Sequence, residues 1–226
     1  MGEIVTFPSN GSSCQGYLAK PASGTGPGVV VIQEWWGLTP WIQSVADRLA
    51  AEGYLALAPD LYHGAKASEP DEAQKLMMSL KMDKAALDMS GAYDYLKANG
   101  SGKVGSVGFC LGGGLSLFIA TLKPIGACVV YYGVLPGVQP DLSKISGPVL
   151  GHYAQNDSWA SPDAARALEQ QIRDAGKQVE FHIYPDTTHA FMNTSDPIEK
   201  VGAAHNPDAS KLAWERTLAF YKQHLS

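Results

Sequence analysis

The segment at 108–112, Gly-Phe-Cys-Leu-Gly, places a cysteine between two glycines, each two positions away. This is the spacing of a nucleophile elbow, with cysteine in place of serine, where a strand turns at once into a helix. The turn would hold Cys110 in a strained backbone conformation, and the glycines would keep side chains out of it. The helix start would favour a thiolate, and the Leu111 amide could point at an oxyanion. For this motif alone, a buried structural cysteine remains the alternative.

A thiol nucleophile needs a base, and the base needs a group that orients it. In the elbow architecture both follow the nucleophile in the chain, first the acid and then the histidine, on loops after later strands. Asp157 comes a few residues after a predicted strand at 148–153, and His189 comes after a predicted strand at 178–184. The order Cys110, Asp157, His189 therefore predicts a catalytic triad.

Other acids and histidines fit these two roles less well. Asp163 is expected in the first turn of a helix, and Asp186 is so near His189 in sequence that no fold is needed to bring them together; either could be a capping or solvated acid. The remaining histidines lie within predicted strands, before the nucleophile, well beyond the last strand or in the final helix: His152, His182, His63, His205 and His224. His189 is therefore the candidate base.

Alternating strands and helices must bring the candidate residues together. Segments at 3–7 and 13–19 flank a turn-forming stretch at 8–11 and predict a β-hairpin, whereas 28–32 is apolar on both faces, like a strand buried in a parallel sheet. The further predicted elements are a helix at 41–50, a strand at 54–58, a long helical region at 71–97, a strand at 103–109, a helix at 111–122, strands at 125–132 and 148–153, a helix at 162–175, a strand at 178–184 and a helix at 207–224. We predict one α/β domain over 1–226, with a mostly parallel open sheet, helices on both faces and an N-terminal antiparallel hairpin.

Composition narrows the possible partners. The chain has 226 residues, a formal net charge of -5 and no run of lysines or arginines, which argues against nucleic acid or an anionic membrane as a partner. The start at 1–4 has no basic or apolar leader character, and no apolar run approaches a membrane span, so we expect a cytoplasmic protein. We expect a small-molecule ester or lactone as partner and a monomer or weak homodimer.

The cysteines indicate neither disulfides nor a metal cluster. Cys14, Cys110 and Cys128 lie far apart with no paired spacing, so each is expected to be a free thiol, with Cys14 and Cys128 in the core. The glycines at 112–114 lack the dinucleotide-binding arrangement. The sequence therefore predicts no metal and no cofactor.

Several motifs together resemble the dienelactone hydrolase family, the carboxymethylenebutenolidases, a cysteine-using branch of the α/β-hydrolases. They are Gln-Glu-Trp-Trp-Gly at 33–37, Ala-Pro-Asp-Leu-Tyr at 58–62, the elbow at 108–113, Asp157, His-Ala-Phe at 189–191 and Glu-Arg-Thr-Leu at 215–218. The resemblance spans nearly the whole chain and implies the α/β-hydrolase fold.

The same resemblance assigns roles to residues of this chain. It implies Cys110 as nucleophile, His189 as base and Asp157 as the orienting acid. It also implies that Glu34 holds the resting thiol, with a solvated rim acid as the alternative, and that the Trp35 and Leu111 amides form the oxyanion hole. The reaction implied is acyl transfer from a small lactone or carboxylic ester to the thiol, followed by hydrolysis.

One departure from the family pattern concerns the substrate. The family's lactone hydrolases resemble one another in two arginines that grip a substrate carboxylate, but the corresponding segments here, 63–70 and 192–194, contain none, and Lys66 would be a weaker substitute. Aromatic residues instead fall on the loops expected to line the pocket. The expected pocket residues are Trp36, Tyr62, Trp159, Phe191 and Asn193, in addition to Trp35, although any aromatic residue among them could equally be core packing.

The sequence therefore predicts a cysteine-dependent hydrolase of a small lactone or ester, with a neutral or larger ester favoured by the aromatic loops. Two alternatives remain open. A non-catalytic binding protein of the same fold would keep the pocket without turnover, and a redox-sensing Cys110 would react with oxidants rather than esters.

Overall fold

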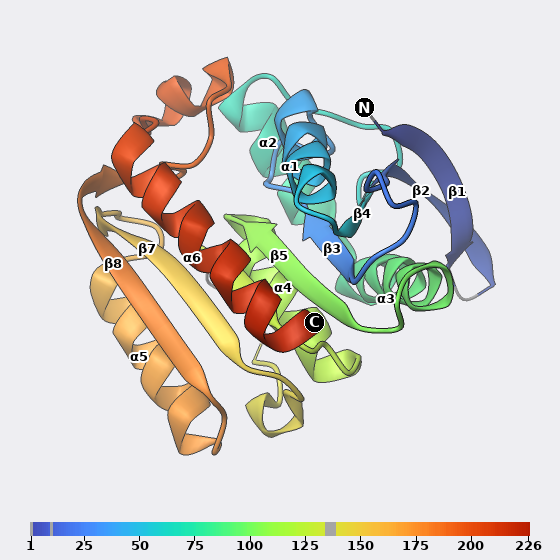
Figure 1. Ribbon diagram of the computed structural model, residues 1–226. Coiled ribbons are helices and arrows are strands. Elements are labelled where there is room, and N and C mark those ends of the chain that lie inside the picture. The colour runs from blue at the N-terminus through green and yellow to red at the C-terminus, as the bar shows by residue number, and fades with distance from the viewer. Residues whose placement is uncertain (1, 10, 134–138) are drawn as a thin grey trace.

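A computed structural model describes residues 2–9, 11–133 and 139–226 of the chain. Its strands form one sheet in the order β1-β2-β4-β3-β5-β6-β7-β8, shown in Figure 1. The strands are β1 (Glu3–Ser9), β2 (Ser12–Ala19), β3 (Gly28–Ile32), β4 (Leu55–Pro59), β5 (Val104–Phe109), β6 (Cys128–Tyr131), β7 (Val149–Asn156) and β8 (Val179–Thr188). From β4 to β8 all neighbours are parallel, whereas β1 pairs antiparallel with β2 and β2 with β4. The predicted mostly parallel α/β sheet with an N-terminal hairpin is confirmed.

Helices cover both faces of the sheet. One face carries α1 (Pro40–Ala51) and α6 (Pro207–Leu225), and the other carries α3 (Met82–Asn99), α4 (Leu111–Leu122) and α5 (Pro162–Asp174). Figure 1 shows α6 crossing in front of the sheet, with α4 and α5 behind it. In the part of the chain that the structure describes, no helix is long and apolar enough to cross a membrane.

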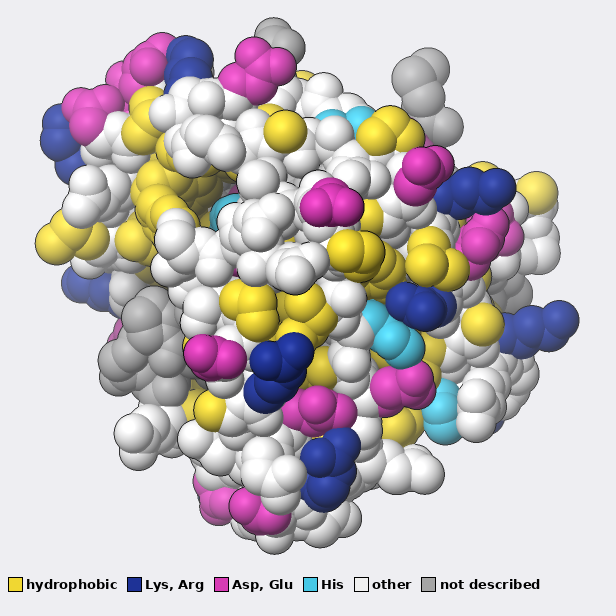
Figure 2. Space-filling view, turned by 90° about the vertical axis from the view of Figure 1, so that its left-hand side faces the viewer, with side chains coloured by type: hydrophobic (Ala, Val, Ile, Leu, Met, Phe, Trp, Pro, Cys, Tyr) yellow, Lys and Arg dark blue, Asp and Glu magenta, His cyan; other side chains and the backbone are white. Residues whose placement is uncertain are grey.

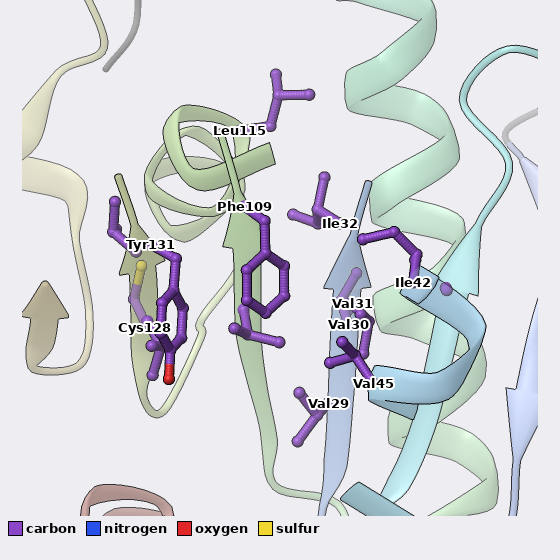
Figure 3. Close-up of a cluster of buried hydrophobic side chains, with 14 of the residues drawn as sticks. Val29, Val30, Val31, Ile32, Ile42, Val45, Phe109, Leu115, Cys128 and Tyr131 are labelled. Carbon is purple, nitrogen blue, oxygen red and sulfur yellow. The ribbon is translucent and has the colours of Figure 1, made fainter. Parts of the chain in front are cut away.

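The core is centred on the middle strands. Residues 29–32 of β3 are completely buried because β4 and β5 flank the strand and helices cover both of its faces. In Figure 3 they lie beside Phe109 of β5, with Ile42 and Val45 of α1 packed against them. Phe109 also stacks on Tyr131 of β6, with ring centroids 4.7 Å apart. This packing fixes the end of β5, from which the elbow continues.

The hairpin turn is shorter than predicted. Pro8 and Ser9 belong to β1, where they pair with Ser13 and Ser12, so the turn does not include all of 8–11. A proline is tolerated there because β1 is an edge strand and need not donate a hydrogen bond on its outer side.

The predicted helical region at 71–97 is two helices. α2 (Pro70–Ser79) ends where Leu80 adopts an extended conformation with ψ of 117°, and α3 begins at Met82. Only Ala73 of α2 is buried, whereas one whole side of α3 packs on the sheet. The two helices cover different surfaces, and neither proline nor glycine separates them in the sequence. The break therefore has no local signal.

A buried chain of polar side chains ties α6 to the sheet. The Tyr131 hydroxyl lies 2.7 Å from Thr217 Oγ1, which lies 3.1 Å from His152 Nε2. On the other side of the ring, His152 Nδ1 lies 2.8 Å from the Tyr184 hydroxyl, which also accepts a hydrogen bond from Arg216. Both ring nitrogens of His152 are thus satisfied, as expected of a structural histidine.

Candidate active site

Cys110 lies in the turn between β5 and α4. Its backbone has φ of 55° and ψ of -119°, a conformation that costs energy for any residue except glycine. A Cβ atom on Gly108 would lie 1.7 Å from the Gly112 carbonyl oxygen, and one on Gly112 would lie 2.4 Å from the carbonyl oxygen of Gln33. Glycine is therefore required at both positions for the backbone segments to approach. The result is a partly exposed thiol at the carboxyl edge of the sheet.

Two further chain segments bring an acid and a histidine to the same edge. Asp157 directly follows β7, His189 directly follows β8, and Asp157 Oδ2 lies 2.7 Å from His189 Nδ1. The other carboxylate oxygen of Asp157 accepts hydrogen bonds from the Trp159 and Ala160 amides at 2.8 and 2.9 Å. Because these amides fix the carboxylate, the carboxylate in turn fixes the orientation of the imidazole.

The charges at this site favour an imidazolium. Burial raises the pKa of Asp157, but the His189 hydrogen bond and charge and the two backbone amides outweigh it, so the pKa is lowered. Burial lowers the pKa of His189, but the neighbouring Cys110 thiolate and Asp157 outweigh it and raise the pKa to about 10. His189 Nε2 is buried and accepts or donates no hydrogen bond within the described chain. The arrangement favours an imidazolium whose Nε2 can give up or take a proton.

Glu34 follows β3 and is almost completely buried, so it is not the solvated rim acid weighed above. Its Oε2 accepts a hydrogen bond of 2.5 Å from Asn193 Nδ2, while its Oε1 has no partner among the described residues. Asn193 Oδ1 accepts from the amide and hydroxyl of Ser195, which fixes the direction of the carboxamide. Burial raises the pKa of Glu34 to about 7, although the His189 charge and the Asn193 hydrogen bond oppose this.

Aromatic rings surround the imidazole. Trp159 stacks on His189 with ring centroids 5.9 Å apart, and its other neighbour is Trp35, which it meets edge-on at 5.1 Å. Trp35 in turn meets Trp36 edge-on. Tyr132 approaches the His189 ring to 5.1 Å, and burial raises the pKa of its hydroxyl far above the usual value. The rings exclude water from the imidazole and so strengthen its interactions with charged neighbours.

Two cavities open beside the thiol, and both are lined by Cys110, Ser158, Trp159 and His189. The first, which we name the Glu34 cavity, has a volume of about 60 Å³ and is also lined by Glu34, Trp35, Trp36, Asn156, Thr188, Ala190, Ile198, Val201 and Gly202. The second, which we name the Met77 cavity, has a volume of about 470 Å³ and is also lined by Met77, Leu111, Tyr132 and Ala160. A substrate carbonyl at the thiol would therefore have space on two sides.

The expected pocket residues divide into two groups. Trp36 and Trp159 line a cavity beside the thiol, whereas Phe191, Tyr62 and Asn193 line neither of the two. Phe191 is a correction: it is completely buried and packs in the core against Tyr132 and Tyr184. Asn193 acts on Glu34 instead, and the Tyr62 hydroxyl is buried without a partner in the described chain.

Sequence reasoning missed Tyr132 and Met77. Tyr132 directly follows β6, and its φ of 39° marks a second strained turn at the carboxyl edge of the sheet. Its position after a buried strand is the signal that could have identified it, because ligands bind at this edge. Met77 lies on α2 and lines a cavity together with Cys110, and no sequence pattern indicates that α2 ends at Ser79 as a helix separate from α3.

The sheet, the helices on both faces and the strained elbow define the α/β-hydrolase class. Within it, the dienelactone hydrolase family model matches residues 14–225, and the chain belongs to that family. The chain is 38% identical to "Protein usf" of Aquifex pyrophilus and 33% identical to "Putative carboxymethylenebutenolidase" of Aquifex aeolicus, with full coverage of each chain in both cases. The crystal structure of "Putative Dienelactone Hydrolase" from Klebsiella pneumoniae has a TM-score of 0.86, 27% identity and 99% coverage of each chain. The protein is thus a hydrolase of the carboxylic ester or lactone class.

Proposed function

We propose that the protein hydrolyses a small carboxylic ester or lactone with a Cys110, His189, Asp157 triad, through an acyl-thioester intermediate. One observation carries this proposal: Cys110, in a strained turn, lines the same two cavities as His189 and contributes to its raised pKa, while Nδ1 of the His189 ring is held 2.7 Å from Asp157. These are the relations between nucleophile, base and orienting acid that acyl transfer requires.

In the first half-reaction the Cys110 thiolate attacks the ester carbonyl carbon, and a C–S bond forms as the carbonyl oxygen becomes negative. The amides of Trp35 and Leu111 are proposed to stabilise that oxyanion. Neither amide donates a hydrogen bond to another residue in the described part of the chain, so both donors are available. When the C–O ester bond breaks, the leaving oxygen takes the proton from His189 Nε2.

In the second half-reaction a water molecule attacks the thioester and gives a proton to His189 Nε2. The carboxylic acid leaves as the C–S bond breaks, which restores the thiolate and the imidazolium. The Glu34 cavity supports this step, since its volume of about 60 Å³ has room for a water molecule beside His189.

Glu34 is proposed to hold the thiol in the resting enzyme. Its Oε1 is buried and has no partner among the described residues, so it can accept a hydrogen bond from a protonated Cys110. A carboxylate with a pKa of about 7, raised by burial, can exchange that proton near neutral pH.

The test is the Cys110→Ala variant, assayed with phenyl acetate and a panel of lactones. Turnover is expected to fall to the uncatalysed rate, and the wild type is expected to show the mass of one acyl group when a slowly hydrolysed ester is rapidly quenched. Cys14→Ala is the matched control, because Cys14 is a free cysteine buried in the core outside the site. Full activity of Cys110→Ala would overturn the triad assignment.

The same assays separate the two other readings. Saturable binding of esters without any turnover by the wild type would favour a binding protein of this fold. Rapid oxidation of Cys110 that is unrelated to ester turnover would favour a redox sensor.

A further inference from the structure

The two cavities beside the thiol differ strongly in size and in chemistry. The Glu34 cavity, at about 60 Å³, has room for a water molecule or a methyl-sized group, whereas the Met77 cavity, at about 470 Å³, has room for a ring or a short chain. The small cavity is lined by a carboxylate and several other polar side chains. The large one is walled mainly by Met77, Leu111, Tyr132 and Trp159.

Trp159 lines both cavities. Its ring is stacked on His189 and meets Trp35 edge-on, although half of its surface is exposed to solvent. Cys110 also lines both cavities. The two substituents of a carbonyl group held at the thiol therefore have two different cavities to enter.

No described residue lining either cavity is a lysine or an arginine. The fixed charges nearby are the carboxylates of Glu34 and Asp157, and the imidazolium of His189 is already paired with Asp157. An anionic group in the Met77 cavity would lose its water without gaining a partner, which is costly in an apolar site. A neutral apolar group would gain from burial instead.

Figure 2 shows one face of the molecule. Hydrophobic side chains gather around a hollow in the upper left of the view, with Lys, Arg, Asp and Glu side chains mostly at its outer rim. The exposed large hydrophobic residues of the described chain include Trp159, at 51%, and Met78, which neighbours Met77 on α2.

We propose that the substrate is an uncharged ester of unequal halves, with a bulky hydrophobic group in the Met77 cavity and a methyl-sized group in the Glu34 cavity. This inference rests on the proposed ester hydrolysis at Cys110. Both halves flank the same carbonyl, so the turnover of two isomeric esters determines whether the acyl or the alcohol half enters the Met77 cavity.

Binding tests the cavity without requiring turnover. The probe is 1-phenylpropan-2-one, a neutral ketone with one benzyl and one methyl substituent, titrated by tryptophan fluorescence or calorimetry against Cys110→Ala. Adding Met77→Lys is expected to weaken this binding by about ten-fold or more, because a cation then occupies the apolar space. Met78→Lys is the matched control, since Met78 is 77% exposed and lines neither cavity.

Turnover by the wild type tests whether the substrate has one bulky and one methyl-sized half. Benzyl acetate and methyl phenylacetate are isomers that carry the bulk on the alcohol and acyl sides respectively, and their kcat/KM values show which half occupies the Met77 cavity. Benzyl phenylacetate, bulky on both sides, and 4-(acetoxymethyl)benzoate, an anion, are each expected to be poorer than the better isomer by about ten-fold or more. Met77→Lys is expected to reverse the preference between benzyl acetate and the anion.

The outcomes separate this inference from the proposed function. Equal kcat/KM values for the neutral, anionic and doubly bulky esters, or ketone binding that Met77→Lys and Met78→Lys affect alike, would overturn the cavity assignment and leave ester hydrolysis standing. Ketone binding that Met77→Lys alone weakens, together with no hydrolysis of any ester by the wild type, would support the cavity and overturn the hydrolysis.

Discussion

Two histidines at neighbouring strands, one completely buried and one half-buried, have opposite properties. His152 lies within β7 and His189 directly after β8. Both nitrogens of His152 have hydrogen-bond partners, Tyr184 on one side and Thr217 on the other. His189 has Asp157 at Nδ1, whereas its Nε2 makes no regular hydrogen bond in the described chain and Cys110 is the neighbour that acts on the ring. The first ring joins structural elements, and the second is left with an unused nitrogen beside a thiol.

The charged neighbours differ as well. Burial, together with the positive charges of His182 and Arg216, holds the pKa of His152 well below its usual value, so the ring is neutral. Burial acts on His189 in the same direction, but the Cys110 thiolate and Asp157 outweigh it and raise its pKa to about 10. Burial alone therefore does not distinguish the structural His152 from His189, which we propose to be the base; the unused nitrogen and the adjacent anions do.

The largest expected difference between the two histidines is in activity. His189→Ala is expected to lower kcat/KM for the preferred ester by about 10³-fold or more, because the proposed group that protonates the leaving oxygen and accepts the proton of the attacking water is lost. His152→Ala, assayed per folded molecule, should stay within a few-fold of wild type. Steady-state kinetics on both variants checks this, and equal losses in the two would contradict the assigned roles.

The second expected difference between the two histidines is in stability. His152→Ala removes a completely buried ring and leaves Tyr184 and Thr217 each short of one partner, which is expected to lower the free energy of unfolding by about 2–4 kcal/mol. Urea denaturation measures it, and a smaller loss is expected for His189→Ala. A destabilisation below about 0.5 kcal/mol would show that the buried chain under α6 contributes little.

The same variant also has a pH signature. Because the folded-state pKa of His152 lies below its unfolded value, the unfolded chain binds more protons in acid, and stability is lost as the pH falls below about 6.5. On lowering the pH from about 7.5 to about 5.5, the free energy of unfolding of the wild type should fall by about 1.4 kcal/mol because of this group. This contribution should be absent in His152→Ala. Parallel pH profiles of the two proteins would contradict a neutral His152.

The smallest expected effect concerns Glu34, a charged neighbour of His189, and the pH dependence of kcat/KM. The pKa of Glu34, raised by burial to about 7, should appear as an inflection in the pH profile of kcat/KM that is absent from Glu34→Gln. Asn193→Ala removes the hydrogen bond that favours the ionised carboxylate, so its inflection should move to higher pH. The kcat/KM values of these variants are expected to differ from that of the wild type by a few-fold. If the inflection persists in Glu34→Gln, it belongs to another group.

Much of the fold could be predicted because its signals are local. The apolar run at 28–32 is buried on both faces as predicted, and the elbow glycines at Gly108 and Gly112 are required by contacts within the motif and with the end of β3. The break between α2 and α3 could not be predicted, since it depends on which surfaces each helix covers. The extension of β1 through Pro8 depends on its position at the sheet edge, which is also a property of the assembled sheet.

In the candidate site, too, some features could be predicted from local signals and others depend on packing. Cys110, Asp157 and His189 were predicted from their order and from the strand ends, and the structure brings Asp157 and His189 into contact beside the thiol. The contact between Asn193 and Glu34 joins residues 159 positions apart, and nothing in either segment indicates it. Phe191 was expected in the pocket because it follows His189, but the turn after β8 directs its ring into the core.

The sequence by itself determined the class of fold and the residues able to carry the chemistry, because hydrophobic periodicity, glycine spacing and chain order are written along the chain. Which polar atoms near the thiol remain without partners, and which residues line the two cavities beside it, are set by the tertiary structure alone. Both depend on distances between segments far apart in the chain, which packing fixes and local patterns do not encode.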